Sequence, residues 1–172
     1  SNLQRQIQFT TADVGRSKAA VLAARVGGDA IDARFEPSHA DDCDAIMDGT
    51  DSPETKFAVA DAAIARGIPY VIAGALRYGG NVFRGGPGSA CYRCLFEAPD
   101  ADGPTCADAG ILGPVCACIG GLAARDALRL IHGDRGDAGT ILVVEDLRRG
   151  FAPRRVSFRP RAGCVCAARA SA

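Results

Sequence analysis

The sequence predicts an α/β fold built around a mainly parallel sheet. An apolar strand at 45–47, a helix at 53–66 and a strand at 69–73 follow one another, and this order is typical of a βαβ unit with parallel strands. Of the 172 residues, 48% are hydrophobic and 23% are charged, so the chain can bury an ordinary core. Two pairs of closely spaced cysteines add a small knuckle to this sheet.

The first elements follow from periodicity and from the residues that stop them. Residues 14–26 carry larger apolar side chains among alanines at helical spacing, and Gly27-Gly28 ends that helix. Residues 30–35 alternate apolar and polar side chains, which predicts a strand. Residues 45–47 form a short buried strand that ends at an Asp-Gly-Thr-Asp turn.

The next helix has clear signals at both ends. Ser52 is a capping residue, Pro53 suits the first helical position, and Glu54 places an acid in the first turn. The helix runs to about Arg66, and Gly67 ends it. The apolar run at 69–73 is then the second strand of the βαβ unit.

The second half of the chain predicts further strands around one long helix. Residues 76–84 indicate an additional strand, and 85–114, rich in Gly, Pro, Asp and Cys, indicate a long functional loop. An apolar helix follows at 115–132. The last strands are expected at 141–144 and 155–158.

Charge and hydropathy exclude some classes of protein. Lys plus Arg and Asp plus Glu number 20 each, so the net charge is zero, and a strongly basic nucleic-acid binder is excluded. No run of about 18 apolar residues is present, which argues against a membrane span. The chain starts at Ser1 without an initiator Met, and we interpret it as a piece of a longer protein.

The cysteine pairs have the spacing of a metal knuckle. Cys91 and Cys94 form a CxxC, and Cys164 and Cys166 form a CxC. Each pair is too close to bridge internally without strain, whereas two such pairs can hold one tetrahedral zinc ion from two sides. A redox CxxC, unrelated free thiols and the disulfides of a secreted protein are the alternatives.

Several other residues have the chemistry of a nucleotide site. Asp51 lies between a buried strand and a helix, where a carboxylate can hold Mg²⁺ beside a phosphate or merely cap the helix. Arg5 and Lys18 are either neutralisers of phosphate charge or solvated side chains. Cys106, in a Gly- and Pro-containing loop, is a candidate nucleophile or an ordinary thiol.

Six short motifs follow one another along the chain. They are Ser1-Asn2-Leu3-Gln4-Arg5-Gln6, Val14-Gly15-Arg16-Ser17-Lys18, Asp48-Gly49-Thr50-Asp51, Cys91-Tyr92-Arg93-Cys94, Thr105-Cys106-Ala107-Asp108-Ala109-Gly110 and Gly163-Cys164-Val165-Cys166. Taken together and in this order, they resemble the ThiF/MoeB/HesA family, the bacterial relatives of ubiquitin-activating enzymes. The resemblance covers essentially the whole chain, and the first and fourth of these motifs are specific.

The resemblance implies an ATP-dependent adenylyltransferase. Such an enzyme adenylates the C-terminal Gly-Gly carboxylate of a ubiquitin-like sulfur carrier of the ThiS or MoaD type, which then becomes a thiocarboxylate in thiamine or molybdenum cofactor biosynthesis. By motif, Asn2 and Arg5 would contact ATP phosphates, Lys18 would stabilise the transferred charge, and Asp51 would bind Mg²⁺. The implied zinc ligands are Cys91, Cys94, Cys164 and Cys166, and Cys106 matches the loop cysteine that some members link covalently to the carrier.

The resemblance also implies an architecture and a setting. We expect residues 1–172 to be a single ThiF/MoeB-like domain with a Rossmann-like sheet, without the family's first βαβ unit and its nucleotide loop. A cytoplasmic homodimer that uses a separate sulfur donor and binds neither nucleic acid nor membrane is expected. Ser52 stands where the family usually has Asn, and the CxC stands where it has CxxC. The alternative is a catalytically incomplete, zinc-containing module that binds a ubiquitin-like carrier.

Overall fold

The structure is a computed structural model that describes residues 2–99 and 110–169. The chain divides into two units, Ser1–Arg34 and Phe35–Ala172. The first unit holds a short 3₁₀ turn, η1 (Thr11–Asp13), and one α-helix, α1 (Lys18–Val26). Ser17 caps α1 by accepting the N–H of Ala20, and Gly27 ends it in the left-handed conformation. The predicted helix is therefore present but begins at Lys18 rather than at 14.

A buried carboxylate organises the segment before α1. Asp13 accepts hydrogen bonds from the N–H and the hydroxyl of Thr10, and it pairs with Arg16 at 3.1 Å and with Arg25 at 2.7 Å. The bonds from Thr10, followed by the two arginines, lower the pKa of the Asp13 carboxyl. Arg25 lies in the last turn of α1, so Asp13 ties the end of the helix to the turn that precedes it.

The prediction of a strand at 30–35 is wrong. No strand is assigned to this segment, and Ile31 is 57% exposed. Alternation indicates a strand only where a neighbouring strand supplies hydrogen bonds, and the described part of the chain pairs none with this segment. Its alternating side chains lie in coil, with a bend at Ala33, before the 3₁₀ turn η2 (Pro37–Ala40) of the second unit.

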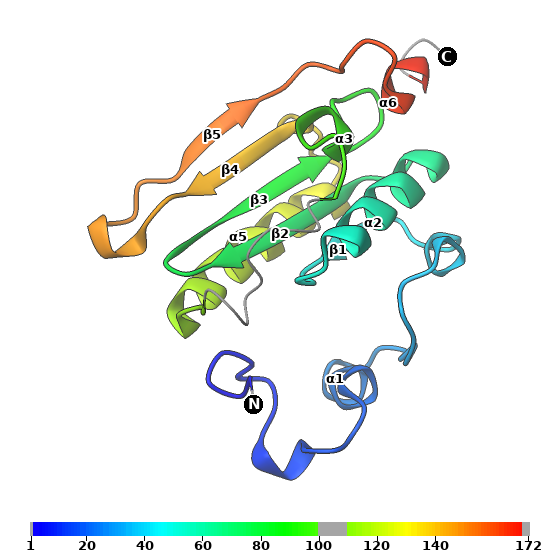
Figure 1. Ribbon diagram of the computed structural model, residues 1–172. Helices are drawn as coiled ribbons and strands as arrows, with labels where there is room; N and C mark the ends of the chain where they lie inside the picture. The colour runs from blue at the N-terminus through cyan, green and yellow to red at the C-terminus, as the bar shows by residue number, and fades with distance from the viewer. Residues whose placement is uncertain (1, 100–109, 170–172) are drawn as a thin grey trace. The chain divides into compact units, whose positions relative to one another are not determined.

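The second unit is built on one five-stranded sheet with the order β1-β2-β3-β4-β5 (Figure 1). Its strands are β1 (Ile46–Asp48), β2 (Tyr70–Leu76), β3 (Gly79–Gly85), β4 (Thr140–Val144) and β5 (Arg154–Ser157). All five correspond to strands predicted in this part of the sequence, with ends shifted by up to three residues. The α/β class is therefore confirmed.

The sheet is mixed, which corrects the expectation of a mainly parallel one. Of its four pairings, β1–β2 is parallel and the other three are antiparallel. The helix α2 (Pro53–Arg66) supplies the crossover that a parallel pair needs. Only Arg77 and Tyr78 separate β2 from β3. Strands joined by so short a connection can pair only as an antiparallel hairpin. Arg77 has a φ of +52°, and a positive φ at this position is a feature of the primed turns that join hairpin strands.

Helices cover both faces of the sheet. Alternate residues of β2 point to opposite sides: Tyr70 and Ile72 pack with α2 and with α3 (Tyr92–Leu95), whereas Val71 packs under α5 (Gly113–Ile131). Figure 1 shows α2 and α5 on opposite faces. The described part of this unit also holds a 3₁₀ turn, η3 (Leu147–Arg149), and a short helix, α6 (Val165–Arg169). Among the described helices, none combines the length and the apolar character needed to cross a membrane.

Candidate functional site

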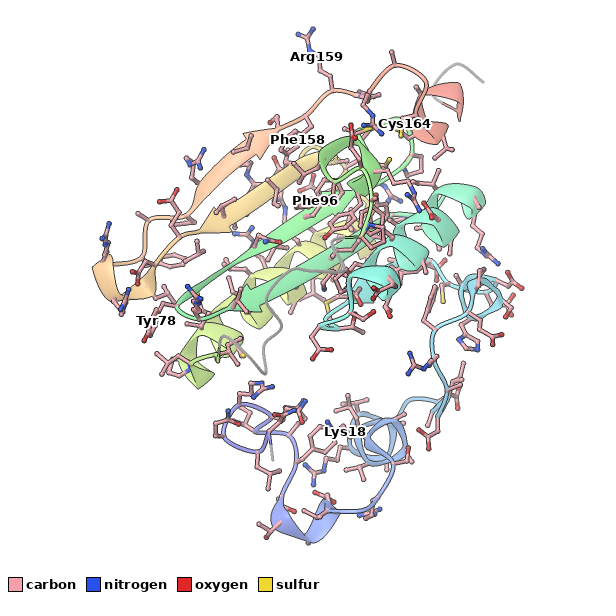
Figure 2. The ribbon with its side chains drawn as sticks, in the orientation of Figure 1. Lys18, Tyr78, Phe96, Phe158, Arg159 and Cys164 are labelled. Atoms are coloured by element: carbon pink, nitrogen blue, oxygen red, sulfur yellow. The ribbon has the colours of Figure 1, made fainter. Side chains whose placement is uncertain are left out.

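Four cysteines from two distant parts of the chain form one cluster. Cys91 precedes α3 and Cys94 lies within it, while Cys164 precedes α6 and Cys166 lies within it. All four Sγ atoms lie within 4.8 Å of one another. Neighbouring Sγ atoms are 3.4 Å apart for Cys91–Cys164 and Cys94–Cys166, and 3.8 Å apart for Cys91–Cys94. Figure 2 shows Cys164 beside α3, as these distances require.

Tight turns at both ends explain how each pair presents two sulfurs to one point. The N–H of Cys94 donates to the carbonyl of Cys91 at 2.9 Å, so α3 begins as a single turn with both thiols on one side. In the second pair, Gly163 has a φ of +76°, and the N–H of Cys164 donates to the carbonyl of Arg161 at 3.0 Å. Cys166 then enters the first turn of α6. The CxC spacing therefore brings its two sulfurs to the cluster as the CxxC does.

The electrostatics of the cluster differ from thiol to thiol. Burial, together with the neighbouring thiols, raises the pKa of Cys91 far above its ordinary value and that of Cys166 to about 11. For Cys94, burial also acts upward, but backbone N–H donors, first that of Arg161 at 3.2 Å from Sγ, outweigh it and lower the pKa to about 7. Backbone N–H groups aimed at sulfur stabilise a thiolate, which is the form that binds metal.

The donor set fits a tetrahedral zinc ion. Four sulfurs about 2.3 Å from one zinc lie about 3.8 Å from one another at the corners of a tetrahedron. Three of the six separations, at 3.4–3.8 Å, are close to that value and much longer than the roughly 2.05 Å of a disulfide bond, and all six are at most 4.8 Å. Cys91, Cys94, Cys164 and Cys166 form no disulfide bond. Cys91, Cys164 and Cys166 are buried, as a closed structural site requires.

Asp51 lies where the sequence predicts it, in the turn between β1 and α2. Its side chain is exposed at the carboxyl end of β1. The helix cap is Ser52, whose hydroxyl oxygen accepts the N–H of Thr55 at 3.1 Å. The alternative that Asp51 merely caps the helix is therefore excluded.

The turn that carries Asp51 is fixed by an ion pair that sequence reasoning missed. Asp48, at the end of β1, is 3% exposed, and its Oδ2 accepts from Lys56 Nζ at 2.8 Å. Lys56 also donates to the carbonyl of Ala73 on β2 at 2.7 Å, and the N–H and hydroxyl of Thr50 donate to Asp48 Oδ1. An Asp two residues before a Thr is a known turn signal, but the reach of Lys56 across two strands is visible only in three dimensions.

The remaining predicted residues lie elsewhere. In the first unit, the carbonyl of Asn2 accepts the N–H of Arg5 at 3.1 Å in a turn, and Lys18 is the exposed first residue of α1. Asp51 belongs to the second unit, so a phosphate site that combines it with Asn2, Arg5 and Lys18 stays a prediction. Cys106 lies outside the described residues.

Comparison with known proteins identifies the family. Residues 1–166 match the family model of the ThiF family. A sulfur carrier protein adenylyltransferase from Thermus thermophilus is 33% identical, over 94% of this chain and 67% of that protein. The probable adenylyltransferase/sulfurtransferase MoeZ from Mycobacterium tuberculosis is 38% identical, over 92% of this chain and 45% of that protein. This chain thus spans about half to two thirds of the length of these relatives.

A solved structure confirms the fold. The crystal structure of E. coli MccB matches with a TM-score of 0.76 at 18% identity, over 96% of this chain and 54% of that chain. The similarity confirms a Rossmann-like α/β sheet with flanking helices. With a family match that covers residues 1–166 and relatives above 30% identity, the chain belongs to the ThiF family.

Proposed function

We propose that this chain is part of an ATP-dependent adenylyltransferase that activates the C-terminal Gly-Gly carboxylate of a ubiquitin-like sulfur carrier. The observation that carries the proposal is the match of almost the whole chain to the ThiF family and to relatives named as adenylyltransferases. We further propose that the product enters thiocarboxylate formation in thiamine or molybdenum cofactor biosynthesis, with a separate sulfur donor. The enzyme is proposed to act as a cytoplasmic homodimer.

The proposed reaction joins the carrier to AMP. A carboxylate oxygen of the carrier's terminal glycine attacks the α-phosphorus of ATP, the bond to the leaving pyrophosphate breaks, and an acyl-adenylate forms. This reaction needs in-line positioning and neutralisation of the charge that develops on pyrophosphate. Arg5 and Lys18 are the side chains proposed to neutralise that charge, and Asn2 is proposed to contact the phosphates.

Asp51 is the proposed ligand for Mg²⁺. Its carboxylate is exposed at the carboxyl end of β1, which is the edge where open α/β sheets bind ligands. The capping role belongs to Ser52, and the pair of Asp48 with Lys56 fixes the turn below it. A bound Mg²⁺ would supply charge neutralisation at the phosphates.

The four-cysteine cluster is the proposed zinc site, with a structural role. The sulfur geometry and the burial of three of the four cysteines support a closed site with no open position for chemistry. Bound zinc would supply a covalent tie between α3 and the segment around Cys164. Cys106, in turn, is proposed as the thiol that links to the carrier.

Carrier-dependent ATP–pyrophosphate exchange tests the proposal. It should be measured on this chain and on a chain that includes the upstream coding sequence of its reading frame, with a carrier ending in Gly-Gly and with the same carrier lacking those two residues. Exchange that requires the Gly-Gly end supports adenylation. Carrier binding without exchange in either chain would favour the alternative function, a zinc-containing carrier-binding module.

Two variants test the assignment of residues. In the chain that shows exchange, Asp51→Ala and Arg5→Ala should each lower the exchange rate by about 100-fold, the usual loss when one electrostatic contact to the transition state is removed. Asp42→Ala and Arg34→Ala are the matched controls, because both side chains are exposed and lie outside the proposed site. Near-normal exchange in either test variant would remove that residue from the proposed machinery.

A further inference from the structure

A buried tyrosine on the central sheet contacts the backbone of the cysteine cluster. Tyr70, the first residue of β2, has no exposed surface. Its hydroxyl oxygen accepts the backbone N–H of Tyr92 at 2.9 Å. That N–H belongs to the peptide that joins Cys91 to Tyr92, so the hydroxyl holds the first peptide of the CxxC motif.

The sheet places the tyrosine ring for this contact. Tyr70 is paired with Gly85 in the antiparallel register of β2 and β3. A Cβ atom on Gly85 would lie 2.2 Å from Cζ of Tyr70, so the ring lies directly over the glycine. Phe83 packs against the same ring at a centroid distance of 6.0 Å. The hydroxyl therefore reaches α3 because residue 85 has no side chain.

A second contact joins α3 to α2. Arg93 donates two hydrogen bonds of 2.7 Å to the carboxylate of Asp61 on α2, and its guanidinium lies 4.8 Å from the centre of the Phe57 ring. That pair is partly exposed, with side-chain exposures of 33% and 41%. The contact from Tyr70 is buried, so water cannot replace the lost partner of the Tyr92 N–H.

We infer that Tyr70 is a positioning residue for the metal site, whose hydroxyl sets the direction in which the CxxC turn presents its sulfurs. The inference rests on the zinc site proposed above. With the Cys91–Tyr92 peptide fixed, Cys91 and Cys94 face Cys164 and Cys166 before metal binds. Groups that orient ligands in this way usually contribute 10–100-fold to metal affinity. Metal binding therefore stabilises the end of the β2–β3 pair that carries Tyr70, and an ordered Tyr70 in turn strengthens metal binding.

Removal of the hydroxyl tests the inference. Zinc affinity is measured by competition with a chromophoric chelator for the wild-type chain, for Tyr70→Phe and for the control Tyr78→Phe, which changes a tyrosine that is 38% exposed. We expect zinc binding about 10–100-fold weaker in Tyr70→Phe and unchanged in the control. Equal affinity in all three overturns the inference and leaves the zinc site intact. If the wild-type chain takes up no zinc, both the proposed zinc site and the inferred role of Tyr70 are wrong.

A measurement on the wild-type chain covers the case in which Tyr70→Phe does not fold. Amide hydrogen exchange of Tyr92 is followed with zinc bound and after chelation, with the amide of Val82 in the centre of the sheet as reference. Because the Tyr92 N–H bond and metal binding are linked, its exchange should accelerate at least about tenfold on chelation relative to that of Val82. Equal acceleration at both amides, or none at Tyr92, contradicts the inference.

Discussion

The Sγ atoms of Cys91 and Cys164 lie 3.4 Å apart although 73 positions separate the two residues in the sequence. This contact closes a long loop within the second unit and brings the segment after β5 against α3. The cluster thus joins parts of the chain that the sheet alone does not bring together.

Loss of one cluster thiol should lower stability as the removal of a cross-link does. A link that closes a loop of this length contributes about 4 kcal/mol, which for a chain of this size corresponds to a fall in Tm of about 8–16 °C. We expect that fall in Cys164→Ser and in the chelated wild-type chain, together with loss of bound zinc. Scanning calorimetry measures the Tm, and metal analysis measures the bound zinc. Cys43→Ser, at an exposed cysteine outside the cluster, should leave both values unchanged.

The buried pair of Asp48 and Lys56 should be costly to break. Lys56→Met leaves a carboxylate whose side chain is 1% exposed without its cation, and we expect a loss of about 3–5 kcal/mol in the free energy of unfolding. Arg154→Met breaks the exposed pair with Glu145 and should cost less than about 1 kcal/mol. Urea unfolding of both variants gives the comparison. Equal, small losses would show that the buried pair does not fix the turn.

Gly85→Ala should affect the sheet and the cysteine cluster together. The added Cβ would lie 2.2 Å from the Tyr70 ring, so the ring must move and its hydrogen bond to Tyr92 must lengthen. We expect a loss of about 1–3 kcal/mol in unfolding free energy, typical of overpacking, accompanied by weaker zinc binding. In Gly74→Ala, the nearest atom to the new Cβ is 3.6 Å away, and zinc affinity should not change. Unchanged zinc affinity in Gly85→Ala would show that the position of the Tyr70 ring does not influence zinc binding.

The pH dependence of stability should include a contribution from Asp146. Hydrogen bonds from the Arg148 side chain and then its backbone N–H lower the pKa of the Asp146 carboxyl to about 2. Because the folded-state pKa lies below the unfolded value of about 3.9, this contribution is present above pH 4 and is lost as the pH falls toward 2. Carboxyl ¹³C NMR titration should show that low pKa and its return toward 3.9 in Arg148→Ala. An ordinary pKa for Asp146 in the wild-type chain would contradict the pairing.

Local signals in the sequence predicted most elements. The errors arose where the outcome depends on pairing between strands. The Ser52-Pro53-Glu54 start and the Gly67 stop gave the limits of α2, because caps act on their own helix. The alternation at 30–35 gave a strand that does not form, since alternation does not specify a pairing partner. The antiparallel order of β2 and β3 depends on a turn at Arg77, which lacks the usual Asn-Gly signature.

In the candidate site, too, the residues marked by local signals were predicted and the contacts between elements were not. Spacing identified the four cysteines, and the strand-to-helix transition placed Asp51, because both signals lie within a few residues of the chain. The ion pair of Asp48 with Lys56 and the bond from Tyr70 to Tyr92 were not predicted. Each joins residues from different elements, so its partners become neighbours only after the sheet has formed.

The distance along the chain between the two cysteine pairs has a consequence during synthesis. Cys94 leaves the ribosome 72 positions ahead of Cys166, an interval of about 4–14 s at 5–20 residues per second. During that time the first two thiols lack the second cysteine pair, and the segment that carries β4 and β5 is still emerging. The nascent chain therefore passes through a stage that is sensitive to oxidants, and the yield of correctly assembled protein in cells should depend on a reducing environment and on zinc supply at the time of translation.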